Sequence, residues 1–217
     1  MKRQKPYLEK IFTDSEFKYY FLGYFLGDGC VNENNIQIDS TDYQIIRDFA
    51  EELNLNVYKK SSTSSYRIVI QSKELIEYLD GLGIGRRKSF EGIRKKIEIP
   101  DKYKFDFLRG LIDSDGSIGR GGKKENPAPD VRFMIKKDGF EEETIDELIE
   151  VLNLKFSKSI IDKKSYSKPM LGYRLSRKSL ESFNKNYKNK TIYLERKNEE
   201  FNKWFECWNK YNHYGSR

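Results

Sequence analysis

The stretch FLGYFLGDG at residues 21–29 recurs at residues 108–116 as LRGLIDSDG. In both copies small residues stand four positions apart within an apolar run: Gly23 and Gly27, then Gly110 and Ser114. Glycine inside a helix costs about 1 kcal/mol relative to alanine, and small residues at positions i and i+4 leave one bare stripe along a helix. The pattern predicts two helices whose backbones touch along these stripes.

Each copy ends in an Asp-Gly pair that stops the helix. If the two helices pack on each other, Asp28 and Asp115 lie side by side at one end of the pair. An isolated Asp-Gly after a helix is usually only a turn, but two copies at matching places on duplicated helices favour a site built from paired carboxylates. The fragment 113–116 does not fit an EF-hand, because Ile118 and Lys124 replace the Gly and Glu that the loop needs.

The order of the expected elements repeats along the chain. A basic arm is expected at residues 1–12, and a capping box from Thr13 to Glu16 opens a helix at about 14–27. Apolar periodicity then predicts the following elements: strand 35–39, helix 42–54, strands 57–60 and 66–71, and a helix around 75–79; in the second half, strand 131–136, helix 145–152, strands 155–161 and 171–176, helix 180–187 and a C-terminal helix 195–210.

A short sequence repeat supports the duplication. Leu53-Asn54-Leu55 returns 99 residues later as Leu152-Asn153-Leu154, whereas the two motif acids are 87 residues apart. The second half therefore has 12 additional residues between these landmarks, since 99 exceeds 87 by 12. The Gly- and Pro-containing stretch at residues 119–129 is the expected place for this insertion.

The two motif stretches resemble the signature of the LAGLIDADG homing endonucleases in their single-chain, two-repeat form. The second copy matches at Leu108, Gly110–Asp113, Asp115 and Gly116; the first is looser, because Leu26 replaces the first Asp of the signature. The resemblance implies an α+β fold with a pseudo-twofold duplicated αββαββα unit. Two antiparallel saddle-shaped sheets would flank the motif helices, with one repeat at residues 1–98 and the other at 99–217.

The composition is compatible with a nucleic-acid-binding protein. The 217 residues carry a net charge of +7 and include 15 Tyr and 14 Phe, and a basic, aromatic-rich chain points first to nucleic acid. Cys30 and Cys207 have no metal-type spacing, which favours a reducing compartment. No apolar run approaches the roughly 20 residues that span a bilayer and no signal peptide is visible, so we expect a soluble, intracellular monomer.

One face of each sheet is predicted to bind double-stranded DNA. Alternation along the strands places apolar residues toward the helices and polar ones on the opposite face, where a β-ribbon can enter the major groove. An ordinary solvated sheet face would look equally polar. With the Lys- and Ser-rich loops 59–65 and 163–168 as phosphate contacts, the predicted DNA-binding residues are Asn35, Gln37, Asp39, Lys59, Arg67, Gln71, Arg132, Lys136, Lys158 and Arg174.

The predicted chemistry is metal-dependent phosphodiester hydrolysis. Divalent ions can activate water and neutralise phosphate charge, and Mg²⁺ prefers one or two protein carboxylates, which Asp28 and Asp115 provide; Mn²⁺ or Ca²⁺ could substitute in binding. The resemblance implies that the backbone carbonyls of Gly27 and Ser114 assist. It also implies one basic residue near each scissile phosphate: Lys88 and Lys197, with Lys190 as a rival for the second.

Two further motif residues receive other roles. Asp113, whose counterpart is Leu26, is expected to hydrogen-bond within the helix pair, and Arg109 to pair with a neighbouring acid. The chain has one His, His213, which argues against a His-based nuclease. The main alternatives are an RNA maturase that assists intron splicing with the same fold, and a transcriptional regulator that has lost cleavage.

Overall fold

A computed structural model describes residues 6–61, 63–86, 88–162, 169–187 and 192–214. The first half contains α1 (Pro6–Phe12), α2 (Glu16–Asp28), β1 (Gly29–Val31), β2 (Ile36–Ser40), α3 (Tyr43–Leu53), β3 (Tyr58–Lys59), β4 (Tyr66–Ile70), α4 (Lys73–Gly81) and α5 (Lys88–Glu91). The second contains η1 (Asp101–Tyr103), α6 (Lys104–Asp115), β5 (Ser117–Lys123), β6 (Asn126–Lys136), α7 (Phe140–Val151), β7 (Phe156–Ile161), β8 (Met170–Leu175), η2 (Arg177–Ser179), α8 (Leu180–Tyr187) and α9 (Glu195–Tyr214). From α2 to α4 and from α6 to α8, the α-helices and strands follow the predicted αββαββα order.

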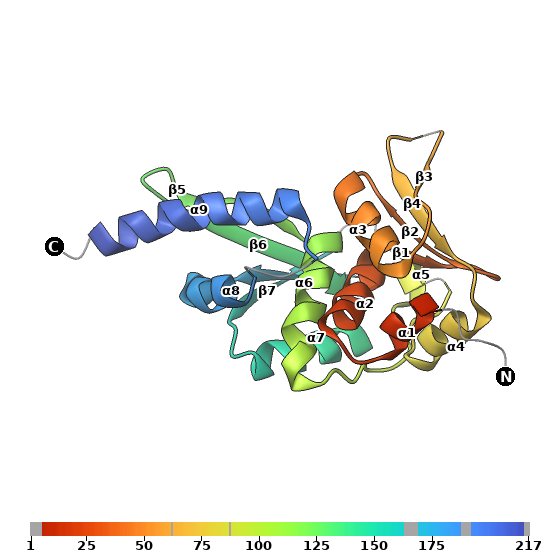
Figure 1. The fold of residues 1–217 in the computed structure, drawn as a ribbon. Coiled ribbons are helices and arrows are strands. Elements are labelled where there is room, and N and C mark those ends of the chain that lie inside the picture. The colour runs from red at the N-terminus through yellow and green to blue at the C-terminus, as the bar shows by residue number, and fades with distance from the viewer. Residues whose placement is uncertain (1–5, 62, 87, 163–168, 188–191, 215–217) are drawn as a thin grey trace.

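The helices α2 and α6 lie side by side at the centre of the molecule, with one sheet on each side (Figure 1). Their backbones touch where the small residues face each other. A Cβ added to Gly23 would lie 2.0 Å from the carbonyl oxygen of Phe107, and one added to Gly110 would lie 2.1 Å from that of Tyr20. The predicted contact along the two small-residue stripes is therefore confirmed.

Each half contains a four-stranded antiparallel sheet, in the orders β1-β2-β4-β3 and β5-β6-β8-β7. The predicted helix-facing residues are buried: Ile36, Ile38, Ile68, Ile70, Val131, Phe133, Ile135, Tyr173 and Leu175. Phe133 stacks on Tyr173 with ring centroids 4.9 Å apart. The opposite face of each sheet is left for solvent or a ligand, as the alternation predicted.

The start of the chain differs from the prediction. Residues 6–12 form the helix α1, in which Leu8 and Ile11 are buried, instead of a free basic arm. The N-cap of α2 is Ser15, whose side chain accepts a hydrogen bond from the Lys18 backbone N–H, rather than Thr13. The arm was mispredicted because two apolar positions in a lysine-containing segment give only a weak helical signal.

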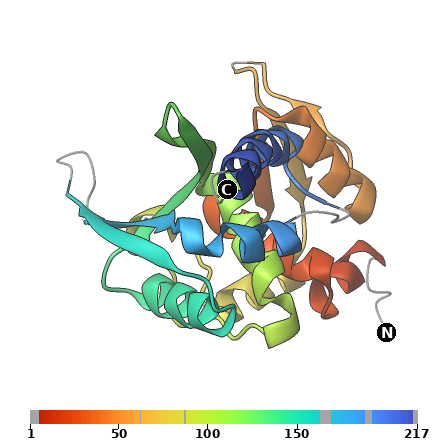
Figure 2. The same ribbon diagram turned by 90° about the vertical axis from the view of Figure 1, so that its left-hand side faces the viewer.

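The insertion predicted at 119–129 consists mostly of paired strand residues. It extends the β5–β6 hairpin, and α9 lies along this hairpin in both views (Figures 1 and 2). Pro127 and Pro129 occur in the part of β6 that pairs with β5 but not with β8, whose pairing begins at Arg132. Proline has no N–H to donate to a neighbouring strand and is therefore confined to positions where that hydrogen bond is not required. This part of β6 is paired on one side only, so it can accommodate both prolines. None of the described helices is both long enough and apolar enough to cross a membrane.

Candidate catalytic centre and nucleic-acid face

The acids of the two motifs converge at one end of the helix pair. Asp28 and Asp115 are the last residues of α2 and α6. A Cβ on Gly27 would lie 3.0 Å from the carboxyl carbon of Asp115 and 2.2 Å from Ser114 Oγ, so only a residue without a side chain lets the helix ends approach this closely. The predicted convergence of the two carboxylates follows directly from this contact.

The protein environment favours the protonated forms of both acids. Burial, and then the negative charge of Asp115, raise the pKa of Asp28 to about 6, although a hydrogen bond from Tyr24 and the charges of nearby lysines oppose the shift. Desolvation also raises the pKa of Asp115, against the influence of Lys88 and Lys197. Two carboxylates in close proximity with raised pKa values are typical of a site that gains stability from a bound cation.

Lys88 and Lys197 lie beside these acids in matching positions. Lys88 Nζ donates to the carbonyl oxygens of Leu26 and Gly27 at 2.6 and 2.9 Å. Lys197 Nζ donates to four carbonyl oxygens at the end of α6, including that of Asp113 at 2.6 Å and that of Ser114 at 3.3 Å. Each ammonium group therefore stabilises the negative end of one motif helix. Burial lowers the pKa of both lysines.

The residues at this centre fit a divalent metal ion that shares its coordination with a substrate. The described residues contain no group of three or more His, Cys, Asp or Glu side chains that could enclose a metal. Mg²⁺ is commonly bound by one or two carboxylates together with water and substrate phosphates, which is what Asp28 and Asp115 can offer. The carbonyl oxygens of Gly27 and Ser114 already accept from the lysines, and each retains a second lone pair.

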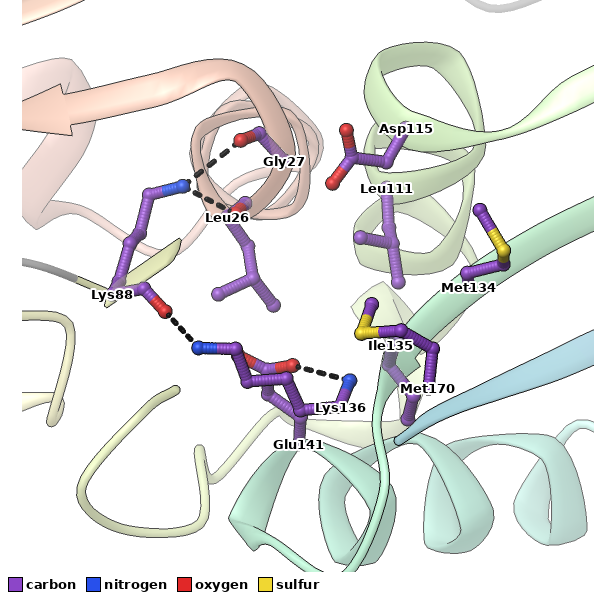
Figure 3. Close-up of a pocket in the computed structure, with 10 residues that line it drawn as sticks. All are labelled: Leu26, Gly27, Lys88, Leu111, Asp115, Met134, Ile135, Lys136, Glu141 and Met170. Atoms are coloured by element: carbon purple, nitrogen blue, oxygen red, sulfur yellow. Dashed lines mark hydrogen bonds between the residues drawn. The ribbon is translucent and has the colours of Figure 1, made fainter. Parts of the chain in front are cut away.

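A pocket of about 220 Å³ opens between the motif helices and the second sheet. Asp115, Lys88 and Gly27 line one side (Figure 3). Glu141, which the sequence analysis did not single out, lies on the other side with Lys136, and burial raises the pKa of its carboxyl. Its only sequence signal is an acid in the first turn of α7, which is common at helix N-termini.

Asp113 and Arg109 have structural contacts, as predicted. Asp113 is fully buried and accepts hydrogen bonds from the hydroxyls of Tyr20 and Tyr187, both at 2.8 Å, and from the backbone N–H of Leu194 at 3.0 Å. Arg109 lies over the Tyr20 ring and pairs with Asp106. Asp113 therefore joins α2, α6 and the chain before α9, away from the pocket of Figure 3.

Most of the predicted DNA-binding residues lie on or beside the open sheet faces. By strand register, Gln37 and Arg67 share the open face of the first sheet with Asp39, whose carboxylate accepts from Arg67 at 2.7 Å and from Lys60 at 2.9 Å. Asn35 and Gln71 stand directly next to β2 and β4. Lys60 belongs to the loop 59–65 that was predicted to contact phosphates, but its ion pair with Asp39 was not predicted.

On the second sheet, Arg132 and Arg174 are cross-strand neighbours and share one carboxylate. Asp130 accepts from Arg174 at 2.7 Å and also bonds Arg132. These residues border a depression of about 510 Å³ that runs along the open face as far as Asp115 and Met134. The depression connects the candidate catalytic centre with a row of guanidinium groups.

Two predicted DNA-binding lysines do not lie on an open sheet face: Lys59, predicted as a phosphate contact of loop 59–65, and Lys158. Lys59 is the register partner of Tyr66, and Lys158 that of Tyr173, so both share the helix-facing side of their sheets. Lys158 pairs with Asp146 of α7 and lies over the Tyr173 ring. Both residues lie on edge strands, where one residue of register decides the face.

Lys136 differs from the prediction in a different way. It is on the open-face side of β6, but its Nζ donates to the carbonyl oxygen of Lys88 at 2.9 Å and is not directed along the sheet (Figure 3). It belongs to the pocket. Lys190 and the predicted phosphate-binding loop at 163–168 lie outside the described residues.

Because the pKa of Asp28 is raised, we predict that the free energy of unfolding of the metal-free protein falls as the pH rises. In the unfolded chain this carboxyl ionises near its ordinary pKa of 3.8, whereas in the folded chain it keeps its proton up to about pH 6. Folded-state stability is therefore lost as pH rises between these values. We expect Asp28→Asn to raise the free energy of unfolding by about 1–2 kcal/mol at pH 8, less than the ~2.7 kcal/mol of two full pKa units because the site is partly solvated. Thermal melts in EDTA at pH 8 and pH 4 measure this gain; an equal gain at both would contradict it.

Comparison with known proteins agrees with this architecture. Residues 17–83 match the family model described as a LAGLIDADG-like domain. The structure of the LAGLIDADG meganuclease I-AabMI bound to uncleaved DNA has a TM-score of 0.59 at 13% identity, covering 92% of this chain and 93% of that one. The homing endonuclease I-GzeII in complex with its DNA target has a TM-score of 0.60 at 11% identity, covering 94% and 92%. I-SmaMI bound to uncleaved DNA in the presence of calcium ions has a TM-score of 0.60 at 11% identity, covering 93% of each chain.

Two curated proteins of Methanocaldococcus jannaschii are also similar. The replication factor C small subunit is 29% identical in an alignment of 123 positions that covers 50% of this chain and 6% of that protein. The reverse gyrase is 24% identical over 173 residues, which are 80% of this chain and 10% of that protein. The chain thus spans a tenth or less of the length of these relatives, and the similarity concerns that portion alone.

Proposed function

Because this chain contains a LAGLIDADG-like domain and has the single-chain, two-repeat fold of the LAGLIDADG homing endonucleases, we propose that it is a site-specific DNA endonuclease. It would bind a long double-stranded target and hydrolyse one phosphodiester on each strand with the help of divalent metal ions. The observation that carries the proposal is the convergence of two carboxylates, one from each half, at the end of a helix pair between two open sheet faces.

The arrangement suits a duplex substrate. A pseudo-twofold pair of sites, each with one acid and one lysine, matches the two antiparallel strands of DNA. The open faces place Arg67, Arg132 and Arg174 where they can reach phosphates or base edges. Each of these guanidinium groups is paired with a carboxylate in the free protein, so DNA has to replace an existing partner, which penalises ligands of the wrong shape.

Within the site, each residue has a separate task. Asp28 and Asp115 would hold the metal ions, which supply phosphate neutralisation and an activated water when bound. Two related structures were obtained with calcium and with manganese present, on I-SmaMI and on I-DmoI, in line with Mg²⁺ as the working ion here and other divalent ions as substitutes. Lys88 and Lys197 would place positive charge beside the phosphates, where negative charge develops during hydrolysis.

A cleavage assay tests the proposal. The protein is incubated with a library of plasmids that carry long randomised inserts, in the presence of either Mg²⁺ or EDTA. The plasmids that become linear are then sequenced. We expect linearisation of a small, sequence-related set of inserts in Mg²⁺ and none in EDTA. Selective binding to DNA without cutting in Mg²⁺, Mn²⁺ or Ca²⁺ would favour a regulator, and selective binding to folded intron RNA would favour the maturase. The carboxylate pair favours the nuclease, since binding RNA alone requires neither acid.

A further inference from the structure

Two short segments carry the lysines of the proposed site, and both cross between the halves. The first lysine segment comprises residues 88–97, at the end of the first half; the second comprises residues 192–197, which lead into α9. In each segment the lysine Nζ donates hydrogen bonds to backbone carbonyl oxygens of the motif helix in the same half. Each segment has further contacts within its own half, such as the ion pair of Arg94 with Asp80 and the hydrogen bond from the Leu194 backbone N–H to Asp113. A second set of contacts joins each segment to the opposite half.

The first lysine segment is held by the second half. Lys136 Nζ, from β6, donates to the carbonyl oxygen of Lys88 itself at 2.9 Å (Figure 3). Further along, the Ile97 backbone N–H donates to Thr144 Oγ1 of α7 at 3.1 Å. These bonds fix the backbone at both ends of the segment.

Glu141 strengthens this attachment. Its carboxylate accepts from the Lys136 backbone N–H at 3.2 Å and from that of Ile93, in the middle of the segment. Lys96 forms an ion pair with Glu147, also on α7. One side of α7, which carries Glu141, Thr144 and Glu147, therefore supports the first lysine segment.

The second lysine segment is held by the first half in the corresponding place, the start of α3. Gln44 donates through Nε2 to the carbonyl oxygen of Tyr193 at 3.1 Å and accepts from the Glu195 backbone N–H at 3.0 Å. Asp42, the N-cap residue of α3, receives two hydrogen bonds from Arg196, both 3.1 Å long. Arg196 directly precedes Lys197.

We propose that these contacts make Asp42 and Gln44 positioning residues for Lys197, and Lys136 and Glu141 positioning residues for Lys88, so that each half sets the strand-cutting competence of the other. The inference rests on the proposed nuclease function. A lysine side chain reaches its carbonyl partners only when its backbone stands at the right distance from the motif helix, and in both cases hydrogen bonds from the opposite half help to set that distance.

The geometry of the contacts is adequate for this role. The ion pair of Asp42 is partly exposed, with 24% and 64% of the two side chains accessible, and an exposed pair of this kind contributes little by itself. It is, however, bidentate, and Gln44 adds two bonds to the backbone on either side of Leu194. On the other side, Lys136 is a charged donor to a backbone carbonyl, a stronger class of hydrogen bond than a neutral one.

The test measures the hydrolysis of each strand separately. A target identified in the cleavage assay is labelled differently on its two strands, and single-turnover rates are determined for Asp42→Asn and Lys136→Met. We expect each variant to slow one strand by about tenfold, with opposite strands affected and nicked intermediates accumulating. Lys136→Arg, which keeps a charged donor, should recover most of the rate.

Matched controls lie next to the tested residues. Glu51→Gln removes an exposed charge from α3, and Lys137→Met removes the positive charge adjacent to Lys136; neither should create a strand bias. Equal slowing of both strands, or a bias toward the same strand in both variants, would overturn the proposal. The wild-type lanes of the same gel report on the nuclease function independently.

A second measurement needs no cleavage. Hydrogen–deuterium exchange of the metal-free protein should show faster exchange at residues 192–197 in Asp42→Asn with unchanged exchange at 88–97, and the reverse in Lys136→Met. Loosening of the segment in the same half as the substitution, or of neither segment, would refute the crossed support even if the wild-type protein cuts no DNA.

Discussion

Asp115→Asn is expected to stop hydrolysis of one DNA strand while the protein still binds its target. The substitution keeps the shape of the side chain but removes the negative charge that would hold a metal ion. Losing several kcal/mol of charge stabilisation in the transition state corresponds to a rate loss of about 10³-fold or more, since each 1.4 kcal/mol is tenfold. Asp28→Asn is expected to have the same effect on the other strand, and the double variant should leave both strands intact.

The measurement combines strand-resolved cleavage in Mg²⁺ with binding to the labelled target in Ca²⁺ at fixed salt, because affinity for DNA depends strongly on salt. Affinity should change by less than about tenfold, as the acids carry no base contacts. Glu77→Gln, which changes an exposed acid on α4 that pairs with Lys73, serves as the control and should cut like the wild type. Full cleavage by the double variant would remove the carboxylate pair from the mechanism.

The helix pair and its acids were predictable because their signal is local and repeated. Small residues at helical spacing require a close partner, and the second copy of the motif supplies one within the same chain. The duplicated order of elements needed only hydrophobic periodicity, which survives in both halves. The acids of the candidate centre were therefore predicted from the sequence, and its two lysines from the family resemblance. The carbonyl partners of Lys88 and Lys197 were not predicted.

The features that were not predicted share a physical cause: each depends on contacts with a strand or helix that is distant in the sequence. Lys59 and Lys158 lie on edge strands, where the face of a residue depends on register with a partner strand far along the sequence. Residues 119–129 carry the predicted insertion, but their pairing as a hairpin covered by α9 was not predicted, because it too depends on a partner far along the sequence. Glu141 and Asp42 look like ordinary acids at helix N-termini, and their contacts with the lysine segments appear only when the two halves are assembled.

Gly110→Ala is expected to cause a large loss of stability for a change of one methyl group. The new Cβ would lie 2.1 Å from the Tyr20 carbonyl oxygen and 2.7 Å from the Tyr24 nitrogen. Both are backbone atoms of α2, so no side chain can rotate away and the two helices must separate. Overpacking of a tight core contact costs 1–3 kcal/mol and occasionally more; with a rigid backbone on the other side we expect about 3 kcal/mol or more, a fall in melting temperature of about 6–12 °C for a chain of this size.

Gly81→Ala provides the matched control for that prediction. Gly81 is also helical, at the end of α4, but a Cβ there meets no atom within 4 Å, so alanine should stabilise the helix by up to about 1 kcal/mol. Gly23→Ala, with its Cβ 2.0 Å from the Phe107 carbonyl oxygen, should behave like Gly110→Ala, since it blocks the same crossing from the other helix. Any Gly110→Ala protein that remains folded should cut poorly, because a wider crossing also moves Asp28 away from Asp115. Thermal melts of the three variants at one pH decide the matter: if Gly110→Ala melts within about 2 °C of the wild type, the close backbone contact that brings the acids together does not exist in solution.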